Sequence, residues 1–443
     1  MFEARREDWL RRAREALASP AVLNSAIVAS GNAAQALASL GTTVMVTRSL
    51  GPSSFGVFSV ALGAATAIAP MMDFGLNPSL LRHAARADAA GDAGAFARLM
   101  RAYAQLNVVF FLAVGAVFLA VSGPLAREVM HFEHLALLRW ACAGALSLNL
   151  LVLGRSLLEA RQRFRDVAVV TSGTALARLG VIAALRATSG LTPAVVLLVY
   201  LALPAAGLLY ALTRLKDIPF ARTVEGGVAR ERRELLVFGG WAGVLALLSA
   251  LSNYLDLALI NRWCDAAAVG CYAAAYRLAF VIITASLPIG SVLRARASAF
   301  KTLERLEAFL DKLKLLTVVA AIGVAAVWAA APLAVRLFFG PAYAEAVPLL
   351  RVLAVGTGFM FAEGPYLTAF YALGRSRPLA AIGLAQLLFF LPALAVLVPL
   401  YGVIGAAWAF ALLRALTFAL ALVLVRSNIA ASRSENPSGV LAA

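Results

Sequence analysis

The stretch TRSLGPSSFGVFSVAL, residues 47–62, decides how this chain is organised, because NRWCDAAAVGCYAAAY, residues 261–276, is similar to it. Each stretch begins where one long apolar segment ends and continues into the next one. A shift of 214 residues aligns Arg48 with Arg262, Gly56 with Gly270, Phe58 with Tyr272 and Arg82 with Arg296. The repeat predicts a chain made of two similar halves.

Long apolar segments account for most of both halves. Of the 443 residues, 62% are hydrophobic and 14% are charged, a composition far more apolar than that of soluble domains. A bilayer core needs about 20 apolar residues per helix. The chain contains twelve such segments, at 22–46, 55–72, 102–122, 136–154, 167–187, 191–213, 236–260, 267–290, 315–337, 348–373, 379–399 and 402–425. Because the runs are continuous rather than alternating, we expect transmembrane helices.

Basic residues are distributed unevenly between the two ends of these spans. Of the 39 Lys and Arg residues, 29 lie in the tails and in the loops that join even-numbered to odd-numbered spans. The opposite loops and span ends hold 6, among them Arg139, Arg186 and Arg336, and the interiors of the spans hold 4. Because basic residues collect on the cytoplasmic side, we expect both termini in the cytoplasm. The net charge of +16 follows from this topology and from anionic lipid headgroups, so it calls for no nucleic-acid partner.

A polar segment at 214–235 separates the spans into six and six. It predicts an N-lobe at 21–213 and a C-lobe at 236–426. Since each half has an even number of spans, both start on the same side, and the two repeats are parallel. Residues 1–20 place their apolar side chains near one helical face, which predicts an amphipathic helix on the cytoplasmic surface. The small, polar residues of 427–443 predict a disordered tail.

Apart from the three arginines at the outer span ends, six ionisable residues fall inside the predicted spans: Arg178, Asp256, Arg277, Arg351, Glu363 and Arg414. Such residues are functional candidates because lipid tolerates charge poorly. Arg178, Arg277 and Arg414 lie about ten to thirteen residues inside their spans, near the midplane, whereas Arg351 lies near a span end and can reach outward. The positive surplus suits an anionic ligand, and guanidinium groups match phosphate oxygens in pairs. We therefore predict that the three midplane arginines bind substrate.

The acids and amides in the spans have two open interpretations. Asp256 and Glu363 bind H⁺ or Na⁺ as coupling ions, or they neutralise arginines, Asp256 pairing with Arg351 and Glu363 with a midplane arginine. Three amides sit in corresponding spans of the two halves, Asn32 and Gln35 in the first span and Asn253 in the seventh. They bind sugar hydroxyls, or they hydrogen-bond between helices.

Several motifs are similar to those of bacterial polysaccharide flippases. In residues 47–86 the family's usual places are occupied by Leu50, Gly51, Pro52, Phe55, Gly56, Asp73, Phe74, Gly75 and Leu76. FFGPAYAEAVPLLRVLA at 338–354 resembles the segment around the family's ninth and tenth spans. ALGRSRP at 372–378 and LYGVIGAAWAFALLRAL at 400–416 resemble its last helices. Over essentially the whole chain, the resemblance is to the O-antigen and exopolysaccharide (Wzx-like) branch of the multidrug/oligosaccharidyl-lipid/polysaccharide (MOP) superfamily.

The resemblance implies an all-α integral membrane protein with about 12 helices in a V of two six-helix lobes. It implies flipping of an undecaprenyl-pyrophosphate-linked oligosaccharide across the inner membrane, driven by an ion gradient, for surface polysaccharide biosynthesis. A polysaccharide polymerase and chain-length proteins are candidate partners, besides membrane lipids. In relatives the cationic cavity is lined by spans 1, 2, 7 and 8, which Arg277 fits directly and Arg178 less directly, while Arg414 is a candidate for burial within its lobe.

Two other functions remain alternatives. A membrane polymerase or ligase of the same pathway needs a sizeable extracytoplasmic loop with catalytic residues, and the loops on that side are short here. A small-molecule antiporter of the superfamily has the same spans, but multidrug exporters favour acidic cavities, opposite in sign to this interior. The phosphate-binding motif GxxxxGK[ST] is absent, and the histidines and cysteines show no metal-ligand spacing. We therefore predict a non-enzymatic flippase without a metal or another cofactor.

Overall fold

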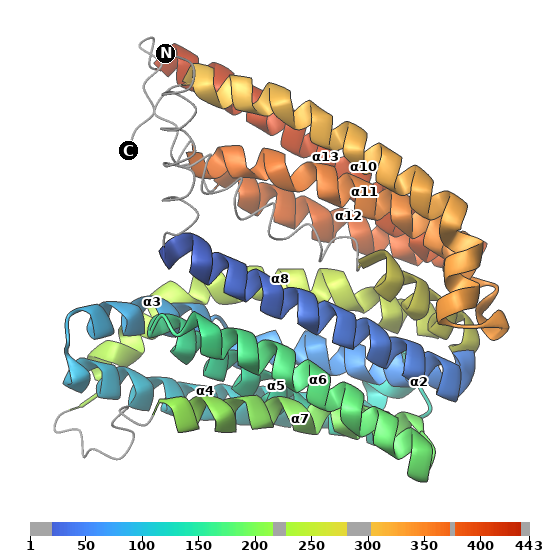
Figure 1. The fold of residues 1–443 in the computed structure, drawn as a ribbon, viewed down its shortest axis with the longest axis horizontal. Helices are drawn as coiled ribbons and strands as arrows, with labels where there is room; N and C mark the ends of the chain where they lie inside the picture. Colours follow the sequence, from blue (N-terminus) through green and yellow to red (C-terminus); the bar gives the residue numbers. More distant parts are fainter. Residues whose placement is uncertain (1–19, 216–226, 281–302, 373–376, 436–443) are drawn as a thin grey trace, which may run out of the picture.

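The computed structural model describes residues 20–215, 227–280, 303–372 and 377–435 of the chain. Within these ranges the chain is helical apart from short turns, and no strand occurs there. Two groups of helices make up the molecule (Figure 1). We call α2–α7 the first bundle and α10–α13 the second bundle.

The first element, α2 (Pro20–Asp73), contains two of the predicted spans. Its 54 residues form a length of about 80 Å if straight, far more than the ~30 Å core of a bilayer. Gly51 breaks the helix with φ 70° and ψ 173°, a conformation that glycine adopts without strain. Pro52 begins the returning helix, where its missing N–H costs nothing. Residues 20–50 are the first arm of α2, and residues 52–73 are its second arm.

The first bundle continues with α3 (Leu76–Ala89), α4 (Ala93–Pro124), the π-helical turn η1 (Leu125–Val129), α5 (Leu135–Ala160), α6 (Phe164–Thr188) and α7 (Pro193–Arg214). Side chains define two of these starts. The carboxylate of Asp92 accepts a hydrogen bond from the N–H of Ala95 at 2.8 Å, and the hydroxyl of Thr192 accepts one from the N–H of Val195 at 3.3 Å. Both satisfy N–H groups that a helix start leaves unpaired.

The rest of the chain comprises α8 (Ala229–Trp263), a shorter helix at Ala266–Phe280, α10 (Leu303–Phe338), the 3₁₀ turn η2 (Pro341–Tyr343), α11 (Ala346–Ala372), α12 (Arg377–Tyr401) and α13 (Val403–Glu435). Helix α8 contacts α2, α3 and α4 of the first bundle and also α12 of the second. Near its start, Glu231 accepts a hydrogen bond from Nε of Arg98 on α4 at 2.8 Å. Helix α8 therefore bridges the two bundles.

Buried clusters show where the bundles join. One cluster contains Phe58 of α2, Tyr272 of Ala266–Phe280 and Leu349 of α11, so it joins both bundles. A second cluster, which includes Leu80, draws on the first bundle and α8. A third, which includes Ile429, draws only on α10–α13. The bundles therefore share a core at one end and have separate cores at the other.

We name these two ends by their contents. The turn end contains residues 47–52, 261–266 and 338–343, where both arms of α2 meet and α10 finishes. The α3 end contains α3, the start of α2 and the end of α13. In Figure 1 the bundles converge at the turn end, on the right, and diverge toward the α3 end, on the left. The arrangement is the V-shaped one that the resemblance implies.

The outward faces of the helices are apolar. Leu112 and Val117 of α4 expose 60% and 64% of their surface, and Ile322 and Leu333 of α10 expose 65% and 69%. Among the described residues, nine helices are long and apolar enough to cross a membrane. Counting α2 as two spans and adding α8 and Ala266–Phe280 gives the predicted twelve. The chain is a multi-pass, all-helical membrane protein.

Two predicted boundaries differ from the structure. The segment 214–235 was expected as a linker, but α8 begins at Ala229, and an ion pair between Arg230 and Glu234, at 2.9 Å, supports its first turns. The tail 427–443 was expected to be disordered, but α13 continues to Glu435, and Arg433 near its end pairs with Glu307 of α10 at 2.9 Å. Residues 1–19 of the expected surface helix and residues 436–443 lie outside the described residues.

Candidate functional site

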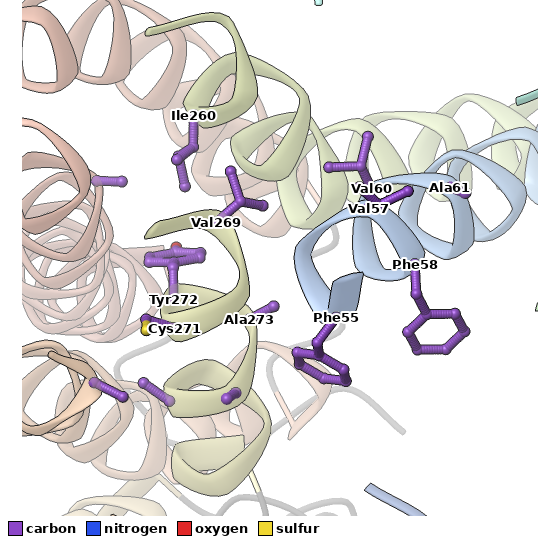
Figure 2. Packing of buried hydrophobic residues seen from close by; sticks show 14 of the residues in the cluster. Phe55, Val57, Phe58, Val60, Ala61, Ile260, Val269, Cys271, Tyr272 and Ala273 are labelled. Carbon is purple, nitrogen blue, oxygen red and sulfur yellow. The ribbon is translucent and has the colours of Figure 1, made fainter. Parts of the chain in front are cut away.

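The candidate site lies where the second arm of α2 meets the helix Ala266–Phe280. The guanidinium of Arg277 lies 5.0 Å from the ring centroid of Phe55 and 5.3 Å from that of Phe58. Figure 2 shows both rings on the arm of α2, with the helix that carries Val269 and Tyr272 alongside. Arg277 is half-buried and makes further contacts. It lies at the boundary between the first bundle and the second half of the chain.

Arg178 of α6 contacts a third ring, Tyr200, which packs against Phe58. Its guanidinium lies 4.3 Å from the ring centroid of Tyr200 on α7, and its Nη2 donates a hydrogen bond to Oγ of Ser39 on the first arm of α2 at 3.3 Å. The ring centroids of Tyr200 and Phe58 are 5.1 Å apart in an edge-to-face arrangement. Because the centroids of Phe55 and Phe58 are 5.8 Å apart, Phe55, Phe58 and Tyr200 form one aromatic cluster, in which Arg178 contacts Tyr200 and Arg277 contacts the two phenylalanines.

The charge of Arg178 is only partly compensated. No carboxylate of the described residues forms an ion pair with it, and its buried Nε has no hydrogen-bond partner there. A charge at the centre of a membrane helix costs about 3 kcal/mol, and a cation–π contact returns about 0.5–2 kcal/mol. The arginine therefore keeps free donor capacity and an attraction for an anion.

A row of polar side chains leads along α2 toward Arg178. Asn32, Gln35 and Ser39 are spaced by three and four residues, which places them on one face of the first arm. The two amides are half-buried, and neither makes a hydrogen bond with a described residue. The row runs from the α3 end toward the aromatic cluster. The third predicted amide, Asn253, lies on α8, and its side chain is outside the described residues.

Arg414 and Glu363 lie inside the second bundle rather than at its boundary. Arg414 of α13 is 8% exposed and Glu363 of α11 is 4% exposed. Arg414 is the cation near Glu363, without an ion pair within 4 Å, and the hydroxyl of Thr417 donates a hydrogen bond to Glu363 at 3.1 Å. The arginine also lies 5.2 Å from the ring centroid of Phe410, one turn earlier. The structure thus brings Arg414 to an acid, and Arg178 and Arg277 to the aromatic cluster.

Asp256 does not pair with Arg351, contrary to one of the sequence interpretations. The Asp256 carboxylate is buried and accepts a hydrogen bond from the hydroxyl of Tyr272 at 2.9 Å. Arg351 instead donates from Nε to the carbonyl of Trp328 at 3.1 Å and lies 4.3 Å from the Trp328 ring centroid. An indole ring and a carbonyl suffice because Arg351 is near a span end. Asp256 thus joins two successive helices of the second half.

Sequence reasoning did not identify the partners of the arginines. Ser39 follows Gln35 by one helical turn, so the polar row on α2 contained a signal for it. Tyr200 and Phe55 carried no such signal, because hydropathy does not tell which faces of different helices meet. Phe58 was singled out only through its alignment with Tyr272. Among the described residues, no group of three or more His, Cys, Asp or Glu side chains gathers as a metal site.

The chain is similar to known membrane transporters in both sequence and structure. Residues 21–294 match the family described as "Polysaccharide biosynthesis protein". Over 386 residues the chain is 26% identical to the "Putative O-antigen transporter" of Shigella flexneri, in a match that covers 84% of this chain and 89% of that protein.

Solved structures show the same fold at low identity. An inward-facing multidrug resistance MATE family transporter of the MOP superfamily superposes with a TM-score of 0.74 at 17% identity, covering 90% of this chain and 96% of that one. The lipid II flippase MurJ, in an inward closed conformation, gives 0.70 at 12% identity, covering 91% and 88%. An outward-facing MATE family transporter gives 0.59 at 16% identity, covering 93% and 96%. Since the family match covers more than half of the chain, the chain belongs to the polysaccharide biosynthesis protein family and has the fold of MOP superfamily transporters.

Proposed function

We propose that this chain is a flippase that carries an undecaprenyl-pyrophosphate-linked oligosaccharide across the bacterial cytoplasmic membrane by alternating access. The observation that carries the proposal is the aromatic cluster, where the halves of the chain meet and which both Arg178 and Arg277 contact. Each guanidinium group can bind two phosphate oxygens at once, so the two arginines suit a pyrophosphate. The O-antigen transporter and the lipid II flippase to which the chain is similar support the same direction.

Each part of the substrate has a counterpart in the proposal. Arg277 and Arg178 hold the pyrophosphate, and the amides of Asn32 and Gln35 bind sugar hydroxyls as the glycan enters from the α3 end. The prenyl chain stays in lipid between the bundles. Asp256 and Glu363 are the candidates for binding H⁺ or Na⁺, and a bound cation there competes with Tyr272 or with Arg414 for the carboxylate.

The position of the basic residues also indicates the direction of transport. The α3 end, with most of the basic residues, faces the cytoplasm, so the structure is open toward the side on which the lipid-linked substrate is made. The protein moves its substrate without breaking a bond and is not an enzyme. A polysaccharide polymerase and chain-length proteins act on the product and are the expected partners.

Arg277→Ala tests the proposal in cells that depend on this chain for surface glycan. We expect glycan display to fall by about 10- to 100-fold, because a hydrogen bond to a charged group contributes about 1.5–3 kcal/mol. Arg277→Lys retains part of the activity, since it keeps the charge but loses the paired geometry. Arg186→Ala is the matched control, because Arg186 is exposed at the end of α6. Normal display by an equal amount of Arg277→Ala protein contradicts the proposal, and drug efflux by the wild type favours an antiporter.

A further inference from the structure

At the turn end, an arginine of the first half binds backbone carbonyls of the second half. Arg48 ends the first arm of α2, and its Nε donates a hydrogen bond to the carbonyl of Phe338 at 3.1 Å, while Nη2 donates to the carbonyl of Leu337. These carbonyls end α10 of the second bundle. Beside them, the hydroxyl of Tyr343 donates to the carbonyl of Thr47 at 3.2 Å.

The same contact recurs with the halves exchanged. Arg262 ends α8, and its Nη1 donates hydrogen bonds to the carbonyl of Val129, at 3.1 Å, and to that of Glu128. These carbonyls belong to η1, which ends α4 of the first bundle. Next to Arg262, Nδ2 of Asn261 donates to the carbonyl of Met130 at 2.8 Å.

The two contacts are related by the sequence repeat. The shift of 214 residues that aligns Arg48 with Arg262 also places Thr47 on Asn261. In both cases an arginine at the end of the half's first span binds carbonyls at the end of the other half's third span. The last carbonyls of a helix lack partners within the helix and carry its negative dipole end, so each arginine satisfies groups that the helix itself leaves open.

Two aligned glycines lie close to each other between these contacts. A methyl group on Gly270 would lie 2.0 Å from the carbonyl oxygen of Pro52 and 3.1 Å from the N of Gly56. Equivalent residues touch each other only near a two-fold axis. The axis that relates the halves therefore passes near Gly56 and Gly270 at the turn end, with one arginine contact belonging to each half.

We propose that Arg48 and Arg262 are two reciprocal latches that hold the turn end closed, and that both release when this end opens. The inference rests on the proposed alternating access, since a transporter must open the turn end to discharge its substrate. Arg48 is exposed and Arg262 is half-buried, so water can accept the hydrogen bonds of both guanidinium groups when the latches release. The latches therefore favour the closed end without making it permanent.

The test measures the width of the turn end in purified protein without substrate. Spin labels are placed at the exposed residues Ser189 and Ala344, in a background with the three native cysteines replaced by alanine, and pulsed electron resonance gives the distance between them. We expect Arg48→Ala and Arg262→Ala each to raise the ratio of open to closed forms by about tenfold, and the double variant by roughly the product.

Matched controls are Arg336→Ala and Arg127→Ala. Both arginines are exposed and lie beside the same carbonyls in the chain, but their side chains make no hydrogen bond, ion pair or ring contact with a described residue. Arg48→Gln, which keeps a donor, serves if Arg48→Ala does not give monodisperse protein. An unchanged distance distribution in the double variant, or an equal change in the controls, overturns the latches. Because no substrate is present, opening of the variants supports the latches even if the wild type fails to export glycan, in which case only the proposed function fails.

Discussion

A single methyl group on Gly56 is expected to weaken the closed turn end. A Cβ at this position would lie 1.9 Å from the carbonyl oxygen of Ala266 and 3.0 Å from the N of Gly270. Real contacts of this kind are essentially never shorter than 3.0 Å, so the two backbones must separate by about 1 Å. Both neighbours are backbone atoms at a helix start, which cannot swing aside as a long side chain can.

The cost of this separation falls only on the closed form. Inserting a methyl group into a well-packed contact costs about 1–3 kcal/mol, which corresponds to about 5- to 150-fold in an equilibrium constant. In the proposed alternating access, the second arm of α2 and the helix Ala266–Phe280 move apart when the turn end opens, which gives the methyl group room. Gly56→Ala is therefore expected to shift the protein toward the open form rather than only to destabilise it.

The spin-label pair at the turn end measures this shift directly. Gly270→Ala is expected to act in the same direction, because its Cβ meets the carbonyl of Pro52 in the equivalent way. Gly115→Ala on α4 is the control, since no atom lies within 4 Å of the added methyl there. If Gly56→Ala lowers the melting temperature while the distance distribution stays closed, the argument from the glycine contact is wrong.

Two further predictions concern charged groups away from the turn end. Arg414→Leu leaves Glu363 buried without its nearby cation, which is expected to lower the free energy of unfolding by about 1–3 kcal/mol. Adding Glu363→Leu is expected to restore part of this loss. If the two effects are strictly additive in a double-mutant cycle measured by thermal unfolding, the two residues do not interact. Burial lowers the pKa of His83 on α3, although Glu234 opposes the shift, so the folded state binds fewer protons than the unfolded state around and below the ordinary pKa. Stability then falls as the pH falls through this window, and His83→Asn is expected to reduce the change in melting temperature between about pH 7.5 and about pH 5.5; equal changes contradict it.

The twelve spans and the two halves were predictable because hydropathy depends only on local composition. The alignment of Arg48 with Arg262 could also be read from the sequence, although it did not reveal that each arginine binds carbonyls of the other half. Sequence placed Glu363 among the acids able to neutralise a midplane arginine, and Arg414 proved to be the one beside it. The partners of Arg178 were not predictable, because they depend on which faces of α2, α6 and α7 meet.

The bridging position of α8 was missed for a related reason. Because α8 follows the linker, the sequence assigned it to the second half, yet it contacts α2, α3 and α4 of the first bundle. Small residues made this approach feasible: a Cβ on Gly243 of α8 would lie 2.5 Å from the carbonyl oxygen of Phe74. Chain order predicts which helices are neighbours only when the loops are short, and the connection between Arg214 and Ala229, residues 215–228, is long enough to remove that constraint.

The repeat also separates the residues that hold the protein shut from those proposed to bind substrate. Shifted by 214 residues, Arg277 falls on Gly63, Arg178 on Pro392 and Arg414 on Tyr200, so no candidate binding arginine has a basic counterpart. The latch arginines, by contrast, fall on each other. A lipid-linked glycan has no two-fold symmetry, so a site that binds it gains nothing from repeated residues. A closed end between two related halves does benefit from repeated residues, because two equal contacts on opposite sides of the axis resist tilting of the halves in either direction. The symmetry of a charged residue in this chain therefore indicates its role: arginines that align with each other act between the halves, and arginines without a basic counterpart in the repeat are where the substrate is to be sought.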